Sequence, residues 1–105
     1  MELIETPIFT QRILKILSND EYKRMQWMLI VNRRNGRYFP GGCGIIRLPL
    51  EMQYSGQDGG LLNICYYLGR NLKLYLLIPF MKSDNIDITE AQLKMLRDFM
   101  KEDVL

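Results

Sequence analysis

The side chains of this sequence that could act on a phosphate are arginine, lysine and tyrosine. The stretch "NRRNGR" places three arginines, Arg33, Arg34 and Arg37, within five residues. Each could contact a phosphate of an RNA backbone, and such contacts give salt-dependent affinity. A helix C-terminus also favours positive charge, so the same cluster could serve the helix alone. The pattern therefore allows an RNA-binding surface and leaves a purely structural role open.

Two adjacent tyrosines, Tyr66 and Tyr67, lie in a segment with strand character. Successive side chains of a strand point to opposite faces of a sheet. We therefore expect one ring to pack in the core and the other to line the opposite face. There it could stack on a base or donate a proton. Tyr54, in a loop, is a weaker candidate for the same roles.

The 105 residues include no histidine, which removes the commonest general acid and base and the usual metal ligand. Cys43 and Cys65 are not spaced as a CxxC motif and have no further partners for zinc. Idle thiols in a reducing cytosol are expected, with a reactive thiol at Cys43 as the alternative. Any catalysis must rest on Lys, Arg, Tyr, Asp, Glu or Cys. We expect no metal and no other cofactor.

Length and composition indicate a single domain over residues 1–105. The net charge of +2 permits nucleic-acid binding without indicating it. The N-terminus lacks the basic start and apolar core of a signal peptide. No window reaches the roughly 18 uninterrupted apolar residues of a membrane helix. A soluble cytoplasmic protein with no membrane partner is expected.

The first third of the chain predicts a strand and two helices. Residues 1–6 alternate weakly, as in a short strand, and 6–18 form an amphipathic helix with Thr6 as its N-cap. Residues 18–32 open with Ser18 and an acidic residue three positions later, which is a capping box. The two helices are expected to form a hairpin.

The remainder predicts three strands and a last helix. The loop "PGGCG" lets the backbone approach something closely and leads into a strand at 44–52, where Pro49 suggests a sheet edge or a bulge. Segments 61–68 and 72–80 read as a hairpin, and 87–103 as a helix. The order β-α-α-β-β-β-α, with helices segregated from antiparallel strands, is an α+β pattern.

Four landmarks follow one another along the chain: "PGGCG" before the second strand, a glycine pair before the "YY" strand, "LYLL" in the last strand and "DITEAQL" at the start of the final helix. In this order they resemble the RelE/HigB toxins of bacterial toxin–antitoxin systems. The HigB-like branch is the most similar. The similarity runs from "ETPIF" through "LSNDEY" to "EAQLKML", which is nearly the whole chain. No single landmark is specific, whereas their order and spacing together are fairly specific.

The resemblance implies a RelE-like fold: a small antiparallel-rich sheet with an N-terminal helical hairpin and a C-terminal helix, with the helices on one side and a concave face on the other. It implies a ribosome-dependent mRNA endoribonuclease, or mRNA interferase, that inhibits translation without a metal. The implied partners are the ribosome, mRNA and a cognate antitoxin of helix-turn-helix type. DNA would be reached only through the antitoxin complex.

The resemblance also implies where the chemistry would lie. Arg47 is what this chain keeps of a basic cluster in the second strand, and Lys82 matches a lysine at the end of the last strand. Leu62 stands where relatives carry an arginine, and the loop at 53–60 contains no Lys or Arg. The cations would stabilise the charge that develops when a 2′-hydroxyl attacks the adjacent phosphate. The candidate catalytic residues are Arg47, Lys82 and Tyr66, and the candidate RNA-binding residues are Arg33, Arg34, Arg37 and Tyr67.

Three functional readings follow. The first is a toxin that cleaves mRNA. The second is a catalytically weak or inactive protein of the same fold that binds an antitoxin or another protein, because an arginine is missing at Leu62. The third is an interaction subunit unrelated to RNA, in which Leu61 and Leu62 extend an apolar surface. Whether catalysis survives the loss of that arginine is left open by the sequence.

Overall fold

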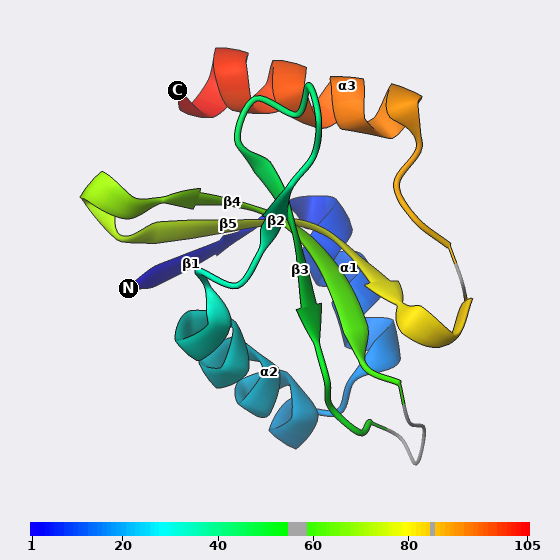
Figure 1. Cartoon of the computed structure of the whole chain (residues 1–105). Coiled ribbons are helices and arrows are strands. Elements are labelled where there is room, and N and C mark those ends of the chain that lie inside the picture. Colours follow the sequence, from blue (N-terminus) through cyan, green and yellow to red (C-terminus); the bar gives the residue numbers. More distant parts are fainter. Residues whose placement is uncertain (55–58, 85) are drawn as a thin grey trace.

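A mixed β-sheet forms the centre of the molecule (Figure 1). The computed structural model describes residues 1–54, 59–84 and 86–105. Within these residues the sheet has five strands in the order β1-β5-β4-β3-β2, with β1 parallel to β5 and the other pairs antiparallel. The strands are β1 (Glu2–Glu5), β2 (Arg37–Tyr38), β3 (Ile45–Leu50), β4 (Leu61–Leu68) and β5 (Lys73–Met81). The predicted α+β class is confirmed.

Helices begin where the sequence predicts them. They are α1 (Pro7–Ile16), α2 (Asn19–Asn32) and α3 (Glu90–Phe99), and a π-helical turn, Met100–Val104, continues α3. The Thr6 hydroxyl accepts a hydrogen bond from the Phe9 N–H at 3.0 Å. The capping boxes that begin α2 and α3 are both formed. These local hydrogen bonds satisfy N–H groups that a helix start leaves unpaired.

The first hydrophobic cluster fills the space between α1, α2 and one face of the sheet. Leu48 of β3, Cys65 of β4 and Leu76 of β5 point to this face. The helices contribute the apolar stripes that the sequence predicts, with Phe9, Ile13, Leu17, Met25 and Leu29 buried. The helical hairpin is therefore held by burial of one contiguous apolar layer.

The second hydrophobic cluster lies on the opposite face of the sheet, under α3. Leu93 and Met100 of the C-terminal segment pack with Ile64 of β4, Leu77 of β5 and Phe39. The expectation that all helices share one side of the sheet is wrong, as Figure 1 shows, with α3 across the sheet from α2. The reason is that the central strands carry large apolar side chains on both faces, so each face needs a cover.

The strands differ from the sequence prediction in two places. The two-residue strand β2 was not predicted, because two residues carry no alternation pattern. β2 pairs with β3 only at Ile46 and Arg47. Pro49 of β3 lies beyond this pairing, on a part of the sheet edge where no neighbouring strand requires an N–H donor. The bulge lies between β4 and β5, at Ile64 and Cys65.

The glycine-rich loop approaches an aromatic ring closely. Gly44 has φ +100°, and a Cβ there would lie 2.6 Å from Cε2 of Tyr66. Only glycine combines this backbone conformation with this contact. The predicted close approach of the loop backbone is thus realised against Tyr66.

No helix in the part of the chain that the structure describes is both long enough and apolar enough to cross a membrane.

Candidate functional site

A hollow of about 390 Å³ opens on the α3 side of the sheet. It is lined by Arg47 of β3, Leu62 of β4, Lys82 just after β5, and Ile86 and Asp87 of the segment that leads to α3. We call it the Arg47–Lys82 hollow. It brings together the two cations and the leucine that the sequence analysis assigned to one site.

Strand register explains this convergence. The Cα of Leu62 is paired with Pro49 on one side and with Phe80 on the other. Arg47 is two residues before Pro49, and Lys82 is two residues after Phe80. Side chains two residues apart share a face of a strand. Leu62 therefore lies between Arg47 on β3 and the end of β5, after which a short 3-10 turn, Lys82–Asp84, begins with Lys82.

Arg47 is held by an aromatic ring and a carboxylate. Its guanidinium carbon lies 4.2 Å from the centroid of the Phe39 ring, which is a cation–π geometry. Its Nη2 donates to a carboxylate oxygen of Asp87. Its buried Nε–H has no acceptor among the described residues. The guanidinium is thus fixed at the hollow before any ligand arrives.

Lys82 has an acidic partner as well, since its ammonium group donates to Glu51. The two cations and two carboxylates cancel in charge. Both pairs are partly open to solvent, with 82% of the Glu51 side chain exposed and 46% of the Asp87 side chain. Exposed ion pairs contribute about 0–1 kcal/mol, so a phosphate can displace either carboxylate.

Tyr66 lies on the same face as the hollow but does not line it. Its ring is covered by Gly44 and packs against the cluster under α3. Tyr67 packs against the α1 and α2 cluster instead. The predicted division of the two tyrosines between opposite faces is confirmed, and Tyr66 is not among the residues that line the hollow with Arg47 and Lys82.

Arg33, Arg34 and Tyr67 meet in a second pocket of about 280 Å³, on the α1 and α2 side of the sheet. Its lining comprises Arg33, Arg34, Gly36, Tyr38, Gly44, Ile46 and Tyr67. We call it the Arg34–Tyr67 pocket. It is on the opposite face from the Arg47–Lys82 hollow.

Contacts inside this pocket link the cations to the phenol. The Nε–H of Arg33 donates to the Tyr67 hydroxyl at 3.4 Å, and the guanidinium carbon lies 5.9 Å from the ring centroid. The hydrogen bond from Arg33, with a further contribution from Arg34, lowers the pKa of Tyr67. Arg33 Nη1 also donates to the Ile30 carbonyl at 2.8 Å, so this arginine stabilises the end of α2 as well.

Arg37 separates from the other predicted RNA-binding residues. Its Cα is paired with that of Arg47 across β2 and β3. Directly opposite side chains project from the same face of a sheet. Arg37 therefore belongs with Arg47, and the predicted RNA-binding set is divided between two faces.

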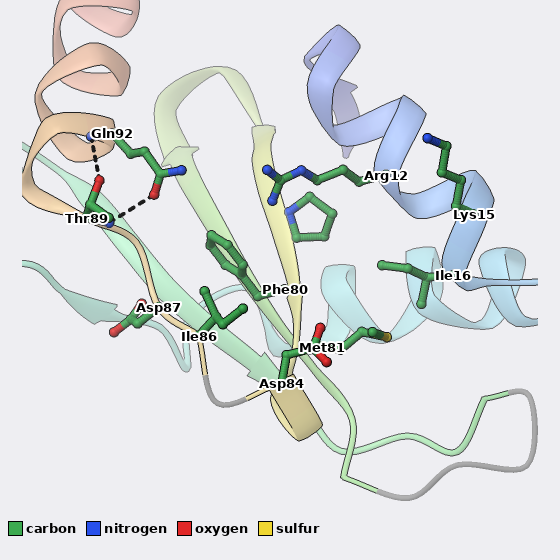
Figure 2. A pocket seen from close by; sticks show the side chains of 11 residues that line it. Arg12, Lys15, Ile16, Phe80, Met81, Asp84, Ile86, Asp87, Thr89 and Gln92 are labelled. Atoms are coloured by element: carbon green, nitrogen blue, oxygen red, sulfur yellow. Dashed lines mark hydrogen bonds between the residues drawn. The ribbon is translucent and has the colours of Figure 1, made fainter.

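A third cavity, of about 410 Å³, adjoins the hollow and shares Ile86 and Asp87 with it. Figure 2 shows it between α1 and the start of α3, with Phe80 at its base. Arg12 of α1 lies over that ring, 5.5 Å from the centroid, and Asp84 lines another part of the wall. No sequence signal singled out Arg12 or Asp87, because each owes its place to tertiary packing.

The described residues of the loop before β4 line neither site. Tyr54 is buried, and its hydroxyl donates to the Gly60 carbonyl at 3.4 Å. The loop that the sequence analysis singled out for its lack of Lys and Arg, 53–60, includes residues 55–58, which lie outside the described residues.

Comparison with models of known protein families gives no match for this chain.

Proposed function

We propose that this chain is a RelE/HigB-type toxin that cleaves mRNA on the ribosome and is neutralised by a cognate antitoxin. The proposal rests on the order and spacing of the sequence landmarks along nearly the whole chain. The observation that carries it further is that Arg47, Leu62 and Lys82, from three separate segments, line one hollow. The resemblance assigned these three positions to one active site.

The chemistry that such a hollow supports is transesterification without a metal. A phosphate between Arg47 and Lys82 would gain positive charge from both sides as the 2′-oxygen loses its proton and bonds to phosphorus. The bond to the 5′-oxygen breaks, which leaves a 2′,3′-cyclic phosphate and a 5′-hydroxyl that has taken up a proton. The Phe39 ring holds Arg47 in place, and binding requires that the phosphate displace the Asp87 carboxylate from it. Tyr66 is a weaker candidate for proton transfer, because Gly44 covers its ring.

A second candidate function is binding without catalysis. Two observations favour it: Leu62 stands at the place expected for an arginine, and each cation of the hollow already has a carboxylate partner. One lost electrostatic donor reduces the rate of such reactions by about 10²–10³. A protein of this kind would still bind its antitoxin and take part in repression through it.

Inducible expression in a bacterium distinguishes the mRNA-cleaving toxin from the protein that binds without catalysis. Growth and mRNA 5′ ends are compared for the native chain, Lys82→Ala and Leu62→Arg. Arrest with new 5′ ends that disappear in Lys82→Ala supports the toxin. Arrest from Leu62→Arg alone supports the inactive form, because Leu62 is partly exposed and an arginine there would point into the hollow. Normal growth with all three chains would count against the toxin, and it would also remove the missing arginine as the reason for a lack of catalysis.

A further inference from the structure

The Arg34–Tyr67 pocket differs from the Arg47–Lys82 hollow in its charge. Its lining within the described residues includes two arginines and no carboxylate. The hollow on the other face holds one carboxylate in its lining and a second on Lys82. Uncompensated positive charge in a concave surface raises the local concentration of anions. The pocket is therefore suited to a negatively charged ligand.

The two arginines are not equally available. Arg33 uses Nη1 for the Ile30 carbonyl and Nε for the Tyr67 hydroxyl. Arg34 is exposed, and within the described part of the chain its side chain interacts with Tyr67. Arg34 can therefore turn toward a phosphate while Arg33 keeps the phenol and the helix end in place.

The pocket also presents aromatic surface. Tyr38, on the edge strand β2, is 74% exposed although it is a large aromatic residue. The hydroxyl of Tyr38 has no hydrogen-bond partner among the described residues. Proteins that bind single-stranded nucleic acids combine a solvent-facing ring with a cationic group: a base stacks on the ring, and a phosphate pairs with the cation.

We infer that the Arg34–Tyr67 pocket binds one nucleotide unit of a single-stranded nucleic acid, with the phosphate held by Arg34 and the base stacked on Tyr38. The pocket faces away from the Arg47–Lys82 hollow. It would bind this ligand whether or not the hollow cleaves RNA. The sequence pattern grouped Arg33 and Arg34 with Arg37 and contained no sign of Tyr38.

The test is an NMR titration of purified protein with ¹³C-labelled tyrosine. The ligands are inorganic phosphate, uridine 5′-monophosphate and a 5′-phosphorylated uridine trinucleotide. The variants are Arg34→Ala and Tyr38→Ala. Lys94→Ala is the control, because it removes one positive charge from α3, where Lys94 pairs with Asp98. Circular dichroism checks that each variant is folded.

The expected order of affinity is trinucleotide, then mononucleotide, then phosphate. Arg34→Ala and Tyr38→Ala should each weaken mononucleotide binding by about fivefold or more. Lys94→Ala should leave it unchanged. Binding should also raise the pKa of Tyr67, since the ligand's negative charge offsets the arginines that lower it.

Three results would overturn the assignment. Equal binding of phosphate and mononucleotide, with no effect of Tyr38→Ala, would leave only an anion site. A trinucleotide that binds more weakly than the mononucleotide would exclude a strand. An equal loss in Lys94→Ala would mean unspecific charge attraction. The assay uses neither ribosomes nor cleavage, so its failure is distinct from failure of the toxin proposal.

Discussion

Asp87 accepts a hydrogen bond from Arg47, which lies 40 residues earlier in the chain. The guanidinium rests on the Phe39 ring on one side and meets this carboxylate on another. A carboxylate and a phosphate oxygen present similar acceptors to an arginine. Under the proposed function, Asp87 would therefore occupy the place of a phosphate and compete with RNA for Arg47.

Replacing this carboxylate should strengthen RNA binding. Asp87→Asn removes the competing negative charge, and we expect the affinity for a short single-stranded RNA to rise about twofold to fivefold at low salt. Asp98→Asn is the matched control, because Asp98 is similarly exposed and pairs with Lys94 on α3. Fluorescence anisotropy measures both. Equal gains in the two variants would show a net-charge effect and remove the role given to Asp87.

The glycine-rich loop should not tolerate a side chain at Gly44. Gly44→Ala puts a Cβ 2.6 Å from the Tyr66 ring at a φ of +100°. We expect the free energy of unfolding in urea to fall by about 1–3 kcal/mol. Gly69→Ala is the control, since its Cβ would meet Tyr67 at an ordinary 3.5 Å. Similar stability of the two variants would contradict the close packing of loop and ring.

Tyr22 should make stability depend on alkaline pH. Burial, together with the hydrogen bond to Glu5 and its charge, raises the pKa of Tyr22 from 10.0 to about 12. The folded state therefore favours the protonated phenol more than the unfolded state does. The resulting stability is complete below pH 10 and is lost as pH rises toward 12.

Tyr22→Phe should lose that part of the pH dependence. Urea unfolding at several pH values between 9 and 12, for the native chain and the variant, measures it. Identical slopes in the two proteins would mean that Tyr22 titrates as an ordinary tyrosine.

The two thiols should differ in reactivity. Cys65 is fully buried, and burial raises its pKa well above the usual range, whereas Cys43 is exposed. A thiolate is the reactive form. Iodoacetamide followed by mass spectrometry should therefore modify Cys43 in the native protein and Cys65 only after unfolding. Simultaneous modification of both would place Cys65 outside the core.

Much of the fold was predictable because its signals are local. The residues that begin α2 and α3, Ser18 and Thr89, form their hydrogen bonds within one helical turn. The face covered by α3 was not predictable, because it depends on both faces of the central strands being apolar. The apolar residues of the last predicted helix include Phe99 and Met100, of which Met100 is buried and Phe99 is 36% exposed.

The candidate site was predictable in part. The resemblance assigned Arg47 and Lys82 to one site, and both line the hollow. Their partners Asp87 and Glu51 lie in irregular segments, whose path no periodicity describes. Tyr38 was missed for the same reason, because a two-residue strand has no pattern.

The parallel pairing of β1 with β5 joins the start of the chain to a strand made near its end. The Thr6 hydroxyl donates to the Leu77 carbonyl, 71 residues away. Contacts so distant along the chain form late, since a long loop must close first. During synthesis β1 has no partner until β5 has left the ribosome. A growing chain therefore stays without its complete sheet, and without the hollow beside β5, until β5 itself has been made and released.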